Sequence, residues 1–177
     1  AQAEKIVRLG ITIINALALV LLPRMSALLR SQQYDTAVTY YSKSVDLTFF
    51  LAMPMMCGFA LISDDFIPFF LGPGYDGAIP VMKILSMLLV VLGLAQIIGT
   101  PLLIPLKREN QYTICVCIGA ISNLMVNYLL IPSFGAVGAA VATILSETLV
   151  TGMEMFYIKD VFPLNKIMGS FLHYLLP

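Results

Sequence analysis

The sequence predicts an all-α fold, a polytopic bundle of transmembrane helices. Of its 177 residues, 59% are hydrophobic and 11% are charged, far from the balance of an ordinary soluble domain. Long apolar runs follow one another with short polar breaks between them. Each run reaches or approaches the roughly 17 to 25 residues with which a helix crosses about 30 Å of hydrocarbon. The runs are residues 6–22, 45–62, 78–106, 112–131 and 134–158.

The two ends of the sequence indicate an interior fragment of a longer chain. The first residue is Ala1 rather than Met, and the last apolar stretch, 167–177, has about half the length of a span. We therefore expect five full spans and a truncated sixth, which form a single transmembrane lobe over residues 1–177. A cleaved signal peptide is not expected, because the charged start leads directly into a full span.

Basic side chains lie in alternate loops of the predicted bundle. The intervening loops, 63–77 and 131–135, contain no Lys or Arg. Because cytoplasmic loops of membrane proteins carry an excess of Lys and Arg, we expect the basic loops in the cytoplasm. Lys5 and Arg8, at the start of the first span, would then lie outside, but seven basic loop residues outweigh these two. The seven are Arg24, Arg30, Lys43, Lys107, Arg108, Lys159 and Lys166.

The segment that follows the first span is predicted to be an interfacial helix. Residues 26–44 mix apolar with charged side chains, which is typical of a helix at the membrane surface, here leading into the second span. Pro54 interrupts that span and is a hinge candidate, since its kink would either shape a cavity or fit neighbouring helices. Glycine and proline at 72–74 predict a turn before the third span.

The third span combines a polar face with two prolines and one charge. Gln96 lies on a face of small and polar side chains, where it is a candidate for lining a cavity. Pro101 and Pro105 lack amide hydrogens and should bend or break the end of the span, which makes them hinge candidates. Lys83 either snorkels to the membrane interface or binds an anion, and snorkelling is the commoner behaviour.

Asn123 and Asn127 share one face of the fourth span. Side-chain amides at such positions either hydrogen-bond a neighbouring helix or bind sugar hydroxyls. Helix association is the more common use of these amides in membranes. Both residues are nevertheless candidates for a transport cavity.

Glu147 falls near the middle of the fifth span, where an ionisable group costs at least about 2.5 to 3.5 kcal/mol and needs a partner or a water-filled path. At 100° per residue it shares a face with Thr143 and Glu154. A neighbouring stripe of small residues from Gly135 to Ser146 predicts close helix packing. Two interpretations of Glu147 stay open, a protonated carboxyl bonded to another helix or a group in a transport path. For Glu154, nearer the interface, we expect a solvated structural role.

Metal, cofactor and soluble-enzyme chemistry find no support in the sequence, so no catalytic residue, metal site or cofactor is expected. Cys57, Cys115 and Cys117 all lie inside predicted spans, and the last two point to nearly opposite sides of a helix. His173 is the one histidine, and the common phosphate-loop, nucleophile-elbow and zinc motifs are absent. A net charge of zero argues against nucleic-acid binding.

Several short motifs, taken in order along the chain, resemble one family of membrane transporters. The chain is similar to the C-terminal half of Wzx-type oligosaccharide flippases, which carry O-antigen or capsular repeat units and belong to the multidrug/oligosaccharidyl-lipid/polysaccharide exporter superfamily. Singly the motifs are weak, but their order and spacing extend over most of the chain. They are Leu22-Pro23-Arg24-Met25-Ser26, Phe70-Leu71-Gly72-Pro73-Gly74-Tyr75, Asn127-Tyr128-Leu129-Leu130-Ile131-Pro132 and the run from Phe134 to Thr143 that is followed by Ser146-Glu147.

The resemblance implies one lobe of a two-lobed transporter in a bacterial inner membrane, with the N-terminal lobe missing from this sequence. It implies an undecaprenyl-diphosphate-linked oligosaccharide as substrate, flipped to the outer leaflet by alternating access for surface polysaccharide biosynthesis. A coupling ion, either proton or sodium, is an expected partner, and Glu147 is its candidate site. Family members often place cations in the cavity to meet the diphosphate. Because Lys83 is the one cation well inside a predicted span here, most of that charge is expected to come from the missing half. Pro23, Arg24 and Ser26 form the cytoplasmic loop motif.

Other functions remain open at this stage. An ion-coupled exporter of cationic drugs belongs to the same superfamily and would suit the acidic face of the fifth span. A membrane-embedded glycan polymerase or acyltransferase would show polar or histidine-bearing loops at the surface, and the outer loops here are short and poor in such groups. A purely structural membrane protein predicts no water path past Glu147. We expect a transporter rather than an enzyme.

Overall fold

The computed structural model describes residues 2–72 and 74–162, and within these ranges all regular structure is helical. The predicted all-α class is therefore confirmed. Pro73, Lys166, His173 and the predicted partial span at 167–177 lie outside the described residues. The helices are α1 (Gln2–Arg30), α2 (Tyr34–Leu71), α3 (Ala78–Ser86), α4 (Leu88–Ile98), the π-helix η1 (Gly99–Leu103) and α5 (Glu109–Ile158).

Contrary to the prediction from the sequence, residues 26–44 do not form one interfacial helix, although residues 34–44 do lead into the second span as a helix. Residues 26–30 continue α1, a three-residue turn follows, and α2 begins at Tyr34 and runs through the second span without a break. The mixed polarity arises because both helices extend beyond their apolar runs. α2 has 38 residues and so measures about 57 Å, longer than the hydrocarbon layer.

The prolines act differently in the two helices that contain hinge candidates. α2 remains helical through Pro54. In the third span the α-helical pattern changes at Gly99 to the π-helix η1, which contains Pro101, and turns follow from Ile104 onward. A proline cannot donate the i to i−4 hydrogen bond, so the backbone takes a wider turn at this point.

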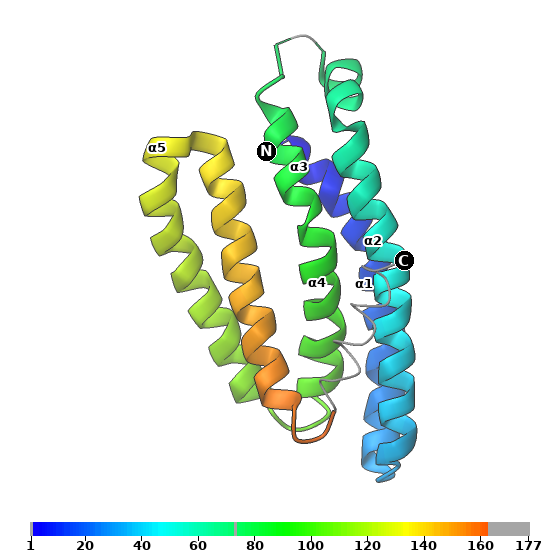
Figure 1. Cartoon of the computed structure of the whole chain (residues 1–177). Coiled ribbons are helices and arrows are strands. Elements are labelled where there is room, and N and C mark those ends of the chain that lie inside the picture. Colours follow the sequence, from blue (N-terminus) through cyan, green and yellow to red (C-terminus); the bar gives the residue numbers. More distant parts are fainter. Residues whose placement is uncertain (1, 73, 163–177) are drawn as a thin grey trace.

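α5 consists of two helices joined by a tight reversal. Gly135 has φ 54° and ψ −128°, a conformation that glycine adopts without strain. The reversal falls inside the predicted turn at 131–135. Figure 1 shows the two halves of α5 side by side, the yellow-green half running up to the turn and the orange half returning.

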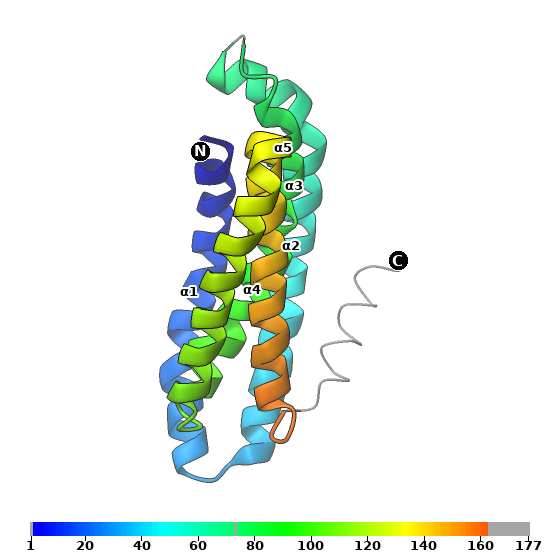
Figure 2. The ribbon, with the colours of Figure 1, turned by 90° about the vertical axis from the view of Figure 1, so that its left-hand side faces the viewer.

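The helices form an elongated bundle (Figures 1 and 2). α1 packs against α2, α3, α4 and η1, while α5 packs against α3, α4 and η1. The α1–α2 turn, the loop before α5 and the last turn of α5 lie at one end of the bundle (Figure 1). We call this the basic end, because Arg24, Arg30, Lys43, Lys107, Arg108 and Lys159 lie in or near these segments.

Two apolar clusters hold the bundle together, one toward each end. Toward the basic end, Tyr41, Phe49 and Leu102 are fully buried with neighbours from α1 and α4. Toward the other end, Ile67 and Met82 are fully buried among residues of α1, α3 and α5. The described helices include four that are long and apolar enough to cross a membrane, and the last of them, α5, is folded into two.

Candidate functional site

A polar cavity of about 590 Å³ opens between α1, α4, η1 and both halves of α5. Its walls bring together residues that are distant in sequence, because α1 and α5 face one another across it. Most of the polar groups come from positions inside the apolar helices, where the bilayer would otherwise exclude them. The polar lining residues are Arg8, Asn15, Gln96, Thr100, Tyr112, Asn123, Thr143, Ser146, Glu147 and Glu154.

Arg8 and Glu147 contribute opposite charges to this cavity. Arg8 projects from the first turns of α1, and Glu147 comes from the middle of the second half of α5. Both residues also line a small hollow beside the cavity, and the guanidinium acts electrostatically on the carboxyl group. A cation and a carboxylate are therefore placed at one level of the bundle, within apolar helices.

Glu154 is buried, so the expected solvated role for it is wrong. Its side chain is 2% exposed, and its Oε2 atom has no hydrogen-bond partner among the described residues. The other carboxyl oxygen lies against Gly99 of η1, where a Cβ atom would come within 2.9 Å of it. Position near the end of a helix does not predict this burial, because the turn of α5 that carries Glu154 packs against η1.

Three asparagines add amide groups in this region. Asn123 and Asn127 are candidates from the sequence, and Asn15 is not. Asn127 donates a hydrogen bond from Nδ2 to Oδ1 of Asn123 at 2.8 Å, within the same helix. This contact is neither the interhelical bond nor the ligand contact that the sequence analysis weighed. The Oδ1 atoms of Asn127 and of Asn15 on α1 are buried without a partner among the described residues. Asn123 and Asn15 line the cavity, whereas Asn127 is not one of its lining residues.

Gln96 and Thr143 also line the cavity, as their candidate status would require. The Thr143 hydroxyl donates to the carbonyl of Ala139 at 2.9 Å, so its oxygen still presents lone pairs to the cavity. Small residues let these walls approach one another. Gly138 packs on the other half of α5 so closely that a Cβ atom would lie 2.5 Å from the carbonyl oxygen of Leu130.

Lys83 lies outside the cavity. Its Nζ atom donates to both carboxylate oxygens of Asp64 at 2.8 and 2.7 Å, and this exposed ion pair joins the last turn of α3 to α2. Neither snorkelling to the interface alone nor anion binding describes this contact. The cation that the structure places in the cavity is Arg8 instead.

The Pro23, Arg24 and Ser26 motif also lies away from the cavity, at the basic end of α1. The Arg24 guanidinium donates to the Tyr40 hydroxyl at 2.8 Å and lies over the Tyr40 ring, 4.8 Å from its centroid. Pro23 and Arg24 border a second, apolar groove between α1 and α2. Arg24 therefore joins α1 to α2 near the turn that connects them.

Arg8, Asn15 and Tyr112 are cavity residues that the sequence reading did not select. Arg8 lies near the start of the chain, where a basic residue is typical of the flank of a span. Arg8, Ile11 and Asn15 are spaced by three and four residues, so they share one face of a helix. That spacing was the signal, and it indicates a polar stripe at the start of an otherwise apolar helix.

The chain was compared with known proteins. Residues 1–175 match the family described as lipid II flippase MurJ. A membrane protein of Methanocaldococcus jannaschii is 32% identical over 145 residues, which cover 81% of this chain and 27% of the relative. The protein named "Probable low-salt glycan biosynthesis flippase Agl15" of Haloferax volcanii is 28% identical over 146 residues, or 82% of this chain and 31% of that protein.

A solved structure titled "Lipid II flippase MurJ, inward closed conformation" shares the fold. The TM-score is 0.80 at 19% sequence identity, over 98% of this chain and 38% of that one. The chain thus spans about a quarter to a third of the length of the curated relatives given above. The family match extends over nearly all of its residues, and its helices are long and apolar enough to cross a membrane several times. The chain is a multi-pass membrane protein that belongs to the lipid II flippase MurJ family, in the flippase superfamily that its sequence motifs indicate.

Proposed function

We propose that this chain is one lobe of a transporter that flips undecaprenyl-diphosphate-linked oligosaccharide repeat units across a bacterial cell membrane by alternating access. The observation that carries the proposal is the cavity of about 590 Å³, which holds Arg8 and several amide and hydroxyl groups between apolar helices. Groups of this kind are costly in a bilayer unless a path or a polar ligand uses them. The match to the flippase family supports the same conclusion.

The cavity offers complementary chemistry for the two polar parts of such a substrate. Arg8 would meet the diphosphate, because a guanidinium presents several N–H donors to phosphate oxygens. Asn123, Gln96 and Thr143 would bond sugar hydroxyls as donors and acceptors. Glu147 would compensate the charge of Arg8 when the cavity is empty, and it is the proposed site of a coupling proton or sodium ion.

Conformational change would take place where the helix geometry is irregular. We propose that η1, with Pro101 inside it and Pro105 just beyond, is the hinge that lets α5 and α1 separate. Pro54 is a weaker hinge candidate, because α2 stays helical through it. In this scheme the basic end faces the cytoplasm, and the lobe that this sequence does not contain closes the other side of the cavity.

Export of cationic drugs is the second candidate function. It is favoured by one observation, the presence of two carboxyl groups, Glu147 and Glu154, on a single cavity wall. An acidic wall attracts a cation, whereas a diphosphate requires the positive charge of Arg8. The charge on the substrate therefore discriminates the two functions. Neither function requires the lobe to alter its substrate chemically.

Reconstitution of the full-length transporter in liposomes would test the proposal. A fluorescent polyprenyl-diphosphate oligosaccharide would be placed in one leaflet, and its appearance in the other would be measured by quenching. We expect Arg8→Gln to slow flipping roughly tenfold, equivalent to about 1.4 kcal/mol of lost stabilisation. Lys5→Gln is the matched control, because Lys5 is exposed on the same first turns of α1 and does not line the cavity.

Two outcomes would contradict the proposal. If Arg8→Gln and Lys5→Gln flip the lipid equally well, the cavity cation has no part in substrate binding. If the liposomes accumulate a cationic dye but leave the lipid-linked oligosaccharide in its original leaflet, the drug-export function replaces the proposed one.

A further inference from the structure

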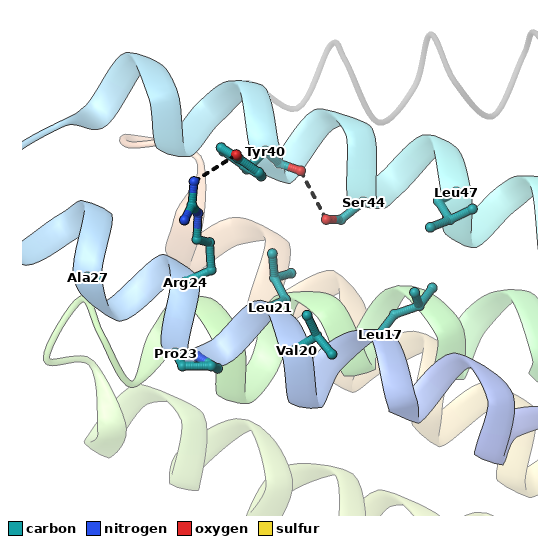
Figure 3. Close-up of a pocket in the computed structure, with 9 residues that line it drawn as sticks. All are labelled: Leu17, Val20, Leu21, Pro23, Arg24, Ala27, Tyr40, Ser44 and Leu47. Carbon is teal, nitrogen blue, oxygen red and sulfur yellow. Dashed lines mark hydrogen bonds between the residues drawn. The ribbon is translucent and has the colours of Figure 1, made fainter.

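A long apolar groove of about 700 Å³ runs between α1 and α2, on the part of the bundle nearest the basic end (Figure 3). Leu21 forms part of its floor and is 6% exposed, while Val20 and Leu47 on its rims are 74% and 42% exposed. The groove is therefore open along its side rather than enclosed. Of the nine described residues that line it, Arg24 alone carries a charge.

Arg24 is held at one end of this groove. It reaches from α1 to α2, where its Nη2 atom donates to the Tyr40 hydroxyl at 2.8 Å, as the dashed line in Figure 3 shows. The Ser44 hydroxyl, one turn further along α2, donates to the backbone carbonyl oxygen of Tyr40 at 2.9 Å. A guanidinium has five N–H donors, so the bond to Tyr40 leaves further donors to meet an anion.

The groove and the polar cavity lie on opposite faces of α1. At 100° per residue, Arg8, Ile11 and Asn15 point to one side of the helix, whereas Leu17, Val20 and Arg24 point to the other. A ligand in the groove would therefore not enter the cavity. The groove is a separate feature of the same helix, and the proposed function makes no use of it.

We propose that this groove binds one acyl chain of an anionic phospholipid, with the lipid phosphate on Arg24. The apolar floor and rims match a hydrocarbon chain, and the single positive charge at the basic end matches a phosphate group. Basic pockets between membrane helices bind anionic head groups in this way. The volume is within the roughly 300 to 1,000 Å³ of ordinary ligand sites.

The arrangement favours a structural phospholipid over a free anion. A free phosphate would need several donors in an enclosed site, whereas here one cation lies at the end of an open apolar groove. Arg24 also joins α1 to α2 through Tyr40. A lipid phosphate on Arg24 and an acyl chain between Val20 and Leu47 would stabilise the contact between these two helices.

Native mass spectrometry of the full-length protein would test the site. The protein would be released from detergent after equilibration with phosphatidylglycerol or with phosphatidylcholine of the same chains. We expect phosphatidylglycerol to be retained in preference, and Arg24→Gln to weaken its binding about fivefold, the typical effect of one basic residue near the surface. Arg30→Gln is the control, because Arg30 is exposed at the same end of α1 and does not line the groove.

A second pair of variants tests the apolar part of the site. Val20→Trp would fill the groove and reduce retention of phosphatidylglycerol. Leu19→Trp is a matched control, because Leu19 is the next residue, has the same 74% exposure and does not line the groove. Both substitutions place an indole ring at an equally exposed position of α1, so a difference between them reports on the groove.

Three results would overturn the inference. Equal retention in Arg24→Gln and Arg30→Gln would show that Arg24 does not bind the phosphate. Protection of Val20→Cys from an aqueous or a lipid-soluble maleimide would show that another helix of the full-length protein fills the groove. Displacement of the bound phospholipid by polyprenyl diphosphate at equal concentration would assign the groove to the transported lipid instead.

Discussion

Arg8 and Glu147 show how a pair of charged side chains can be placed in an apolar bundle. Each would be costly alone in hydrocarbon, but the two lie around one cavity and the guanidinium acts on the carboxyl group. Loss of the Arg8 charge removes the cation that acts on the Glu147 carboxyl group in this cavity. The site residues are thus expected to affect transport more than folding, because neither packs in an apolar cluster.

Replacement of Glu147 tests this expectation. We predict that Glu147→Gln reduces flipping roughly tenfold while the amount of protein in the membrane stays near normal, because glutamine keeps the shape of the side chain but not its charge. The measurement is flipping activity against membrane abundance. Thr148→Ala is the control, since Thr148 is the adjacent residue and is exposed. Equal losses of abundance and activity in Glu147→Gln would make the residue structural.

Gly138 packs closely against the other half of α5, near the reversal at Gly135. We predict that Gly138→Ala lowers the free energy of unfolding by about 1 to 3 kcal/mol, because the new Cβ atom would lie 2.5 Å from the Leu130 carbonyl oxygen. Gly152→Ala, on the same helix with open space around it, should instead stabilise by about 0.5 to 1 kcal/mol. Thermal unfolding in detergent would measure both, and shifts of the same sign would refute the prediction.

Single residues were the least predictable part of the site. Glu147, Thr143, Gln96 and Asn123 could be selected because polar side chains in apolar runs need a reason. The contact between Lys83 and Asp64 could not be foreseen, since it joins residues 19 positions apart across a turn. The spacing of Arg8, Ile11 and Asn15 predicts one helix face. Because Arg8 lies near the first residue, it also fits the flank of a span, and the sequence does not decide between the two.

Elements were better predicted than residues. All five apolar runs lie within helices of the structure or end beside them, because length and hydropathy alone decide whether a segment can cross a bilayer. Helix ends were harder to predict. α1 and α2 extend by polar turns beyond their apolar runs, and a hydropathy pattern contains no signal for that extension.

α5 carries a contact that closes the open end of its hairpin. Arg108, just before the first residue of α5, donates from Nη1 to Oδ1 of Asp160 at 2.8 Å and also bonds the carbonyl of Tyr157. The hydrogen bonds from Arg108 lower the pKa of the Asp160 carboxyl below its usual value. The first and last turns of the hairpin are thus joined at the basic end.

The Arg108 contact should make stability depend on pH. Because the folded pKa of Asp160 is lowered, its contribution is present above the unfolded pKa of about 3.9 and is lost as the pH falls through the folded value. Asp160→Asn should lower the free energy of unfolding by about 0.2 to 1 kcal/mol at pH 7, and the gap to the parent should close in acid. Unfolding at pH 7 and at acid pH would measure the difference in the free energy of unfolding between Asp160→Asn and the parent.

Glu109→Gln is the control for Asp160→Asn, because Glu109 is exposed at the same end of α5. A gap between parent and Asp160→Asn that stays constant from neutral to acid pH would exclude a role for the ionised carboxylate.

The whole molecule has one face lined by polar groups and other faces that suit lipid. This difference predicts which introduced cysteines meet water. We expect Thr143→Cys to react with a membrane-impermeant maleimide, whereas Leu145→Cys, 52% exposed on the apolar surface, should stay unlabelled in a bilayer. The native cysteines would first be replaced. Equal protection of both positions would mean that no water path passes Glu147 and would favour a purely structural membrane protein.

At this scale the sequence predicted the class of the molecule from composition, and its short motifs indicated the superfamily. What it could not predict is the cavity, because a cavity depends on which faces of α1, α4 and α5 meet. Glu154 illustrates the limit. Its place in the chain suggests contact with water, but packing against Gly99 of η1 encloses it.

The α5 hairpin is fastened at both extremities, by the reversal at Gly135 and by the contact between Arg108 and Asp160. Two rods joined at both tips resist sliding past each other and respond to force as a single stiff lever. A force on the Gly135 end of the hairpin would therefore move the second half of α5, which carries Glu147, together with the loop that carries Arg108. Loss of the contact between Arg108 and Asp160 would let the two halves of α5 slide along each other.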